Sequence, residues 1–210
     1  KRCENLICES TIVTLAGQYF NTDKSFSGDV LREYAHGDMQ DAHIDLVVRG
    51  KELVDVAMEV KYISHRLATR PYCDEVLADA VRLACFVTGT APEAARILLA
   101  VGSTSDFERA IWSRRVRASG GGKLVPLSPV VIPSEVNSTF WTVDLEKENV
   151  DKGYQRWLDR FRQQVPVPLP KKLVWRMAAY SCLNVVSLGD DGVEVSIWEI
   201  RSSLDSGMFS

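Results

Sequence analysis

The chain has 210 residues, of which 25 are basic and 28 acidic, giving a formal net charge of −3. This length predicts one domain, with residues 1–101 as a core and residues 102–210 as an elaboration packed on it. The composition, 46% hydrophobic and 25% charged, excludes a disordered or collagen-like chain. No stretch approaches the roughly 18 apolar residues that span a bilayer, and no signal-peptide pattern opens the chain. We therefore expect a cytoplasmic protein without a membrane partner.

The spacing of hydrophobic residues predicts the order helix, three strands, helix and strand in the first half of the chain. Strict alternation in Val54 to Tyr62 is typical of a half-buried strand, and the apolar run from Ile97 to Val101 is typical of a central one. The expected helices cover 3–20 and 74–87, and the expected strands cover 30–34, 43–48, 54–62 and 95–101.

The second half is less regular. We expect a helix over 106–112, a glycine-rich loop over 119–123, a strand over 140–145 and a helix over 152–163. Strands over 183–188 and 193–200 flank the turn sequence Gly189-Asp190-Asp191-Gly192, which predicts a β-hairpin. The predicted fold class is therefore α/β, with a mixed central sheet and a C-terminal α/β extension that carries a hairpin.

Three charged residues on two neighbouring predicted strands form the clearest functional pattern. Asp45 lies in the strand over 43–48, and Glu59 and Lys61 lie in the strand over 54–62. Because alternate residues of a strand project from the same face, Glu59 and Lys61 are neighbours, and hairpin pairing brings Asp45 beside them. We expect two carboxylates and one ammonium group at a single point on the sheet.

This combination suits metal-assisted phosphodiester hydrolysis. Two carboxylates with room for water and phosphate are the ligands that Mg²⁺ accepts, with Mn²⁺ as a substitute. Asp45 and Glu59 would bind the metal, and Lys61 would orient the attacking water or help to remove its proton. An ordinary solvent-facing Glu and Lys pair is the alternative interpretation, and such a pair contributes little to stability.

The pattern Asp45 … Glu59-x-Lys61, between a preceding helix and a following helix and strand, resembles the PD-(D/E)xK nuclease superfamily. The resemblance covers roughly residues 1–101, and the first motif reads Ile44-Asp45 where the family has Pro-Asp. It implies the restriction-endonuclease-like fold and a Mg²⁺-dependent nuclease, with DNA favoured over RNA and a role in bacterial defence, restriction or repair. It also implies a further metal-binding glutamate on the first helix, which Glu9 matches, with Glu33 on the first strand as the substitute.

Other consequences of the resemblance concern the helix over 74–87 and the assembly. Asp79-x-x-Arg82 on that helix is similar to poorly characterised bacterial members of the superfamily, although this spacing favours an ordinary ion pair on a helix surface. Family members often supply two active sites through a homodimer. The sequence begins at Lys1 and not at a methionine, which leaves room for a missing partner domain.

Basic residues outside the predicted core indicate where nucleic acid would bind. Residues 109–123 hold five basic and no acidic side chains, whereas residues 1–60 hold six basic and eleven acidic ones. A solvated helix end is the alternative for the basic segment, and plain solvation is the alternative for the loop after the strand over 54–62. The candidate nucleic-acid-binding residues are His65, Arg66, Arg114, Arg115, Arg117 and Lys123. The second functional hypothesis is a non-catalytic module that retains the nuclease fold to bind nucleic acid or a protein.

Overall fold

The structure is a computed structural model of the chain. It describes residues 8–23, 28–37, 39, 42–50, 54–65, 74–86, 94–107, 115–117, 124–126, 140–144, 162–163, 171–183 and 192–202. The helices within these ranges are α1 (Glu9–Thr22), α3 (Asp74–Cys85) and α4 (Thr104–Phe107). The strands are β1 (Asp29–Ala35), β2 (His43–Arg49), β3 (Val54–Ile63), β4 (Ala95–Ser103), β5 (Arg115–Arg117), β6 (Leu124–Pro126), β7 (Phe140–Asp144), β8 (Lys172–Leu183) and β9 (Val193–Ser202).

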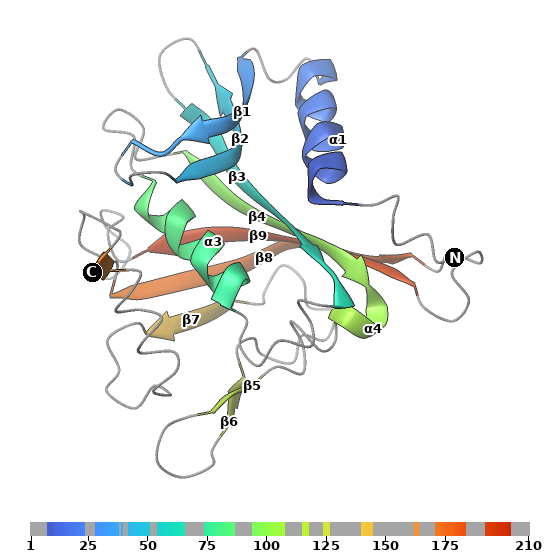
Figure 1. The fold of residues 1–210 in the computed structure, drawn as a ribbon, viewed down its shortest axis with the longest axis vertical. Coiled ribbons are helices and arrows are strands. Elements are labelled where there is room, and N and C mark those ends of the chain that lie inside the picture. Colours follow the sequence, from blue (N-terminus) through green and yellow to red (C-terminus); the bar gives the residue numbers. More distant parts are fainter. Residues whose placement is uncertain are drawn as a thin grey trace.

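Seven of the strands form one mixed sheet in the order β1-β2-β3-β4-β9-β8-β7 (Figure 1). Strands β3 and β4 are parallel, and the other neighbouring pairs are antiparallel. A parallel pair requires a crossover connection, and α3 lies in the chain between β3 and β4. The predicted α/β class with a mixed central sheet is confirmed, and so is the order of elements in the first half.

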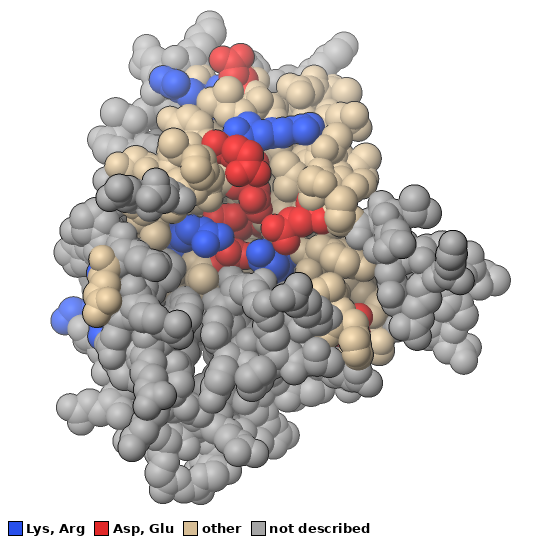
Figure 2. All heavy atoms as spheres, in the orientation of Figure 1, with Lys and Arg blue, Asp and Glu red and all other residues tan. Residues whose placement is uncertain are grey.

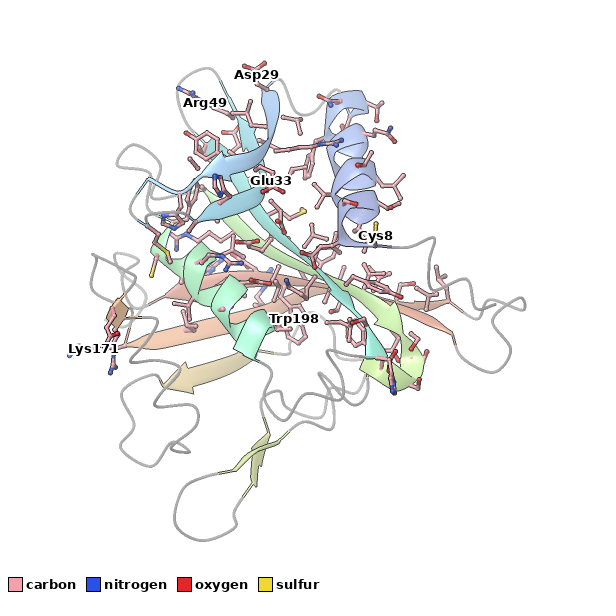
Figure 3. The ribbon with its side chains drawn as sticks, in the orientation of Figure 1. Cys8, Asp29, Glu33, Arg49, Lys171 and Trp198 are labelled. Carbon is pink, nitrogen blue, oxygen red and sulfur yellow. The ribbon has the colours of Figure 1, made fainter. Side chains whose placement is uncertain are left out.

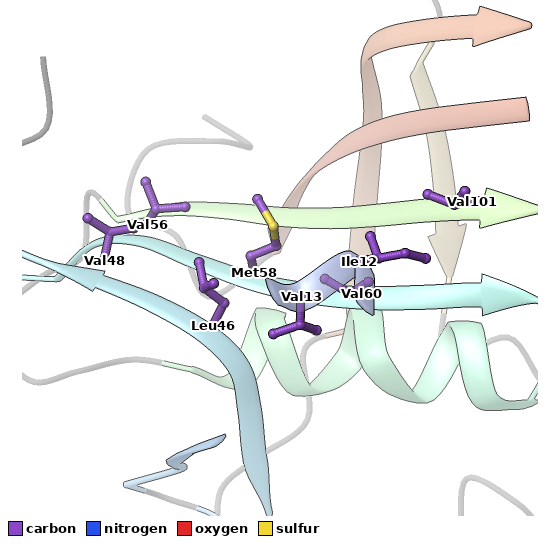
Figure 4. Close-up of a cluster of buried hydrophobic side chains, with 8 residues drawn as sticks. All are labelled: Ile12, Val13, Leu46, Val48, Val56, Met58, Val60 and Val101. Atoms are coloured by element: carbon purple, nitrogen blue, oxygen red, sulfur yellow. The ribbon is translucent and has the colours of Figure 1, made fainter. Parts of the chain in front are cut away.

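The two longer helices pack on opposite faces of the sheet. Ile12 and Val13 of α1 pack with one set of alternating strand residues, which form the hydrophobic cluster in Figure 4. The strand members of this cluster are Leu46, Val48, Val56, Met58, Val60 and Val101. Helix α3 contacts β3, β4 and β9, and its polar side chains reach Glu59, which projects from the other face of β3. Residue parity along β3 therefore separates the apolar side chains that pack on α1 from Glu59, which meets α3, while Lys61 contacts both helices.

Strands β2 and β3 separate partway along their length. Their register runs from Arg49 opposite Val54 to Leu46 opposite Met58. Beyond Met58, β3 continues beside β4 as far as Ile63, while the first residues of β2 pair with β1. This separation leaves the β2-side edge of β3 open from Glu59 onward, and α1 begins next to it (Figure 1).

The structure changes several predicted boundaries. Helix α1 begins at Glu9 and not at residue 3, because Cys8 is extended and its carbonyl accepts the first helical N–H bonds, from Thr11 and Ile12. The predicted helix over 106–112 overlaps α4, which starts at Thr104 and ends at Phe107, and residues 108–112 lie outside the described residues.

The C-terminal hairpin is present, and its first strand, β8, begins at Lys172, before the predicted range of 183–188. Strand β8 ends at Leu183, opposite Val193 of β9, and residues 184–188 lie outside the described residues. A register shift between Met177 and Ala179 interrupts the alternation of β8, which explains why period two failed to reveal this strand. The helix predicted over 152–163 falls almost wholly outside the described residues. None of the helices in the described ranges is both long and apolar enough to cross a membrane.

Candidate active site

The open edge of β3 is filled by carboxylates from two other elements. Oδ2 of Asp45, from β2, accepts a hydrogen bond from the backbone N–H of Val60 at 2.7 Å. Oε2 of Glu9, from the first turn of α1, accepts one from the backbone N–H of Tyr62 at 3.4 Å. Both N–H groups belong to the part of β3 from which β2 has separated. The separation of the strands therefore draws Asp45 and Glu9 to the site, because buried backbone donors require acceptors.

Glu59 lies on the same part of β3, and its side chain is buried. The pairing of β2 with β3 ends at Leu46 and Met58, and the next residues, Asp45 and Glu59, lie where the strands separate, near enough for Asp45 to raise the pKa of Glu59. Only 1% of Glu59 is exposed, and its Oε1 accepts a hydrogen bond of 3.0 Å from Nε of Arg82 on α3. Glu59 therefore enters the site from the sheet face that α3 covers.

Lys61 pairs with carboxylates other than Glu59. Its Nζ lies 2.9 Å from Oδ2 of Asp79 and 3.4 Å from Oε2 of Glu9. Burial lowers the pKa of this ammonium group, but the carboxylates of Asp79 and Glu9 outweigh burial and raise it above its ordinary value. Lys61 is consequently a fixed cation whose described partners are Glu9 and Asp79, and it does not form a solvent-facing pair with Glu59.

The Asp79 and Arg82 pair does not lie on the helix surface, and that prediction was wrong. Asp79 is only 2% exposed, and its Oδ1 accepts a hydrogen bond from the guanidinium of Arg82. The two residues lie on the inward-facing stripe of α3 with the buried residues Val76, Ala80 and Leu83. That stripe was the signal in the sequence: a polar pair within it points toward the sheet and not toward solvent.

His36 contacts the C-terminal end of α3, close to Arg82. Its ring Nε2 lies within hydrogen-bonding distance, 3.2 Å, of the backbone carbonyl of Arg82, and its backbone N–H donates to Ala42. The ring also packs edge-on against Phe86, with centroids 5.2 Å apart. This histidine, which the sequence did not single out for the site, fixes the backbone position from which Arg82 reaches Glu59.

The described cluster contains more acidic than basic groups. Four carboxylates, those of Glu9, Asp45, Glu59 and Asp79, lie around two cations, Lys61 and Arg82. Acidic side chains gather at the centre of the face in Figure 2, with basic ones beside them. Burial, with the neighbouring Asp79 and Asp45, raises the pKa of Glu59 to about 9 against the opposing effect of Arg82. This raised pKa favours the protonated form of Glu59, and the ion pair with Arg82 favours the ionised form.

The excess of acidic groups raises the question of whether the cluster fits the Mg²⁺ that the family resemblance implies. As the side chains stand, no group of three or more His, Cys, Asp or Glu within the described ranges could hold a metal ion. Mg²⁺ usually binds proteins through one or two carboxylates and keeps several waters, so Asp45 and Glu59 form a sufficient donor set. A divalent cation would also favour the ionised form of Glu59 against burial and the neighbouring Asp79 and Asp45, which raise its pKa. The residues present fit Mg²⁺ in donor chemistry and in charge.

Glu33 occupies an unusual position on β1. The pairs Arg32 with Leu46 and Tyr34 with Ile44 place it opposite Asp45, and its φ of 48° is in the left-handed region that non-glycine residues avoid. Glu33 is exposed, and Figure 3 shows it on the β1 side of the space between β1 and α1. Glu9 is the glutamate with direct contacts in the cluster, to Lys61 and to β3. Glu33 lies opposite Asp45, but it has no described contact with Glu59 or Lys61.

The predicted nucleic-acid-binding residues are described only in part. Nδ1 of His65 lies 3.1 Å from Oδ1 of Asp106, whose backbone N–H donates to Oγ of Ser103, just after the parallel ends of β3 and β4. Arg115 and Arg117 are described only as backbone of β5, which pairs with β6 across the glycine-rich segment. Arg66, Arg114 and Lys123 lie outside the described residues.

Comparison with protein-family models, with curated proteins and with solved structures finds no match to this chain.

Proposed function

We propose that the protein is a Mg²⁺-dependent nuclease with a restriction-endonuclease-like core. The observation that carries this proposal is the convergence of Asp45, Glu59 and Lys61 where β2 separates from β3. Each of the three comes from the strand that the motif requires. The α1-β1-β2-β3-α3-β4 order and the parallel pairing of β3 with β4 support the same assignment.

Asp45 and Glu59 would hold the metal ion, with Glu9 next to them and Glu33 as the further candidate. When bound, Mg²⁺ would lower the pKa of a coordinated water and offset negative charge on the phosphoryl oxygens. Glu59 must be ionised to bind the ion, whereas its raised pKa favours the protonated form in the metal-free protein.

Lys61 would act as a cation and not as a base. Its raised pKa keeps the ammonium charged at neutral pH, so it has no free electron pair to accept a proton from water. The ammonium group, held by Glu9 and Asp79, can donate hydrogen bonds to the attacking water and to a phosphoryl oxygen. Of the two roles predicted for Lys61, orientation of the water is the one that this environment supports.

The proposed substrate is nucleic acid, with DNA favoured over RNA on the family resemblance. Supercoiled plasmid, linear DNA and RNA should be incubated with Mg²⁺, Mn²⁺ or EDTA and either wild-type protein or Lys61→Met. We expect cleavage with either metal, none with EDTA, and at least a 100-fold lower rate for Lys61→Met, since loss of one transition-state donor costs about that factor. Cleavage in EDTA, or full activity of Lys61→Met, would contradict the mechanism. Metal-dependent binding without cleavage of any substrate would favour the non-catalytic module.

A further inference from the structure

Two residues of helix α3, Asp79 and Arg82, contact the side chains of Lys61 and Glu59. Oδ2 of Asp79 lies 2.9 Å from Nζ of Lys61, and Oδ1 accepts a bond from Arg82. Nε of Arg82 in turn donates to Oε1 of Glu59 at 3.0 Å. One buried carboxylate is therefore linked directly to the cation of the motif and, through Arg82, to the buried carboxylate of the motif.

These contacts restrict two side chains that would otherwise rotate. A lysine has four side-chain torsions and a glutamate three, so neither side chain has a fixed position without partners. The carboxylate of Asp79 holds the ammonium group of Lys61 in place. Arg82 holds Oε1 of Glu59, and its planar guanidinium fixes the direction of a carboxylate better than a lysine does.

The backbone that carries the pair is also fixed. His36 lies within hydrogen-bonding distance of the carbonyl of Arg82, and its ring packs against Phe86. Asp79 is only 2% exposed, and the side chain of Arg82 is 26% exposed, so the arrangement is part of the packed interior and not a surface ion pair.

We propose that Asp79 and Arg82 are positioning residues, which orient Lys61 and the metal-binding carboxylate of Glu59 for the reaction on nucleic acid. The inference rests on the proposed function, and it adds two residues outside the motif. Hydrogen-bonding partners of metal-ligating side chains typically change metal affinity by 10- to 100-fold when they are removed. Arg82 stands in this relation to Glu59, and Asp79 acts through the two cations that it contacts, Arg82 and Lys61.

Titration calorimetry with Mn²⁺, without nucleic acid, tests this inference apart from catalysis. We expect Arg82→Gln to weaken Mn²⁺ binding by roughly 10- to 100-fold and Arg82→Lys to restore part of the loss. Arg201→Gln is the matched control, because Arg201 also pairs with a glutamate, Glu199, but on the exposed part of β9. It should bind Mn²⁺ like the wild type. Circular dichroism of each variant verifies the fold.

Asp79→Asn provides the second measurement, since asparagine keeps the shape but has only one acceptor oxygen for two cations. Steady-state cleavage of a DNA oligonucleotide should show a kcat about 10-fold lower or more, with KM for DNA changed by less than a factor of about 3. A purely structural role predicts unchanged constants for the folded fraction.

The outcomes separate the two proposals. Unchanged or tighter Mn²⁺ binding by Arg82→Gln would overturn the positioning role while leaving the nuclease intact, because Arg82 would then only repel the ion. A wild-type protein that binds no Mn²⁺ and cleaves no nucleic acid would overturn the proposed function and this inference with it.

Discussion

The raised pKa of Glu59 should make the stability of the protein depend on pH. This pKa is raised to about 9 by burial and neighbouring carboxylates, from an ordinary value of 4.5. Between these values the native state binds a proton that the unfolded state has released. The contribution of Glu59 to the free energy of unfolding therefore falls as the pH rises through this window in the absence of metal.

Glu59→Gln should remove this pH dependence. Urea unfolding in EDTA at about pH 5.5 and about pH 8 should show the variant gaining stability relative to the wild type at the higher pH. Asp55→Asn is the control, because Asp55 is an exposed acid on the same strand. An identical pH dependence in wild type and Glu59→Gln would show that Glu59 is not held protonated.

Asp79 should matter for stability as well as for positioning. It is buried between two cations, and removal of one member of a buried ionic group typically costs roughly 3 to 5 kcal/mol. Asp79→Ala is expected to lower the free energy of unfolding by that amount, measured by urea unfolding near neutral pH. A loss below about 1 kcal/mol would show that Asp79 contributes no more to stability than an exposed ion pair does.

The same substitution at Glu9 and at Glu33 can show which of the two glutamates completes the site. Glu9 contacts Lys61 and the backbone of β3, whereas Glu33 has no described contact to Lys61 or Glu59. We expect Glu9→Gln to reduce the cleavage rate at least 10-fold and Glu33→Gln to reduce it less. The reverse order in a plasmid cleavage assay would identify Glu33 as the carboxylate that completes the site.

At the scale of elements, the parallel pairing of β3 with β4 determines where Lys61 lies. Gly102 of β4 stands opposite Ile63, and a Cβ atom at position 102 would lie 2.7 Å from both Cβ and the carbonyl oxygen of Ile63. Gly102→Ala must push the strands apart near the site, and we expect a loss of about 1 to 3 kcal/mol in urea unfolding. Gly37→Ala is the control, since its added Cβ meets nothing within 4 Å. Equal stability of the two variants would contradict this close packing.

The strands of the motif and the helix α3 could be predicted from sequence, whereas the contribution of α3 to the site could not. Alternation in β3 places Glu59 and Lys61 on one face without tertiary information. Asp79 and Arg82 have the spacing of an ordinary surface pair, although they lie in the apolar stripe of α3, and the packing of α3 on β3 shows which residues they contact. Similarly, the bulge near Met177 conceals β8 from a search for period two.

At the scale of the whole molecule, metal binding should stabilise the fold. The described site has four carboxylates around two cations, and a ligand that binds only the native state raises its stability by RT ln(1 + [L]/Kd). We expect thermal unfolding to shift upward with increasing Mg²⁺ or Mn²⁺ for the wild type, and not for Asp45→Asn combined with Glu59→Gln. An equal shift in both proteins would place the cation elsewhere.

The rate of DNA cleavage as a function of Mg²⁺ concentration is the direct test of the proposed Mg²⁺-dependent nuclease activity. Wild type, Glu59→Gln and Asp55→Asn should be compared on the same plasmid substrate. We expect no cleavage in EDTA, a rate that saturates with Mg²⁺ for wild type and Asp55→Asn, and a loss of at least 100-fold for Glu59→Gln. Cleavage by Glu59→Gln at the wild-type rate, with the same dependence on Mg²⁺, would contradict this expectation.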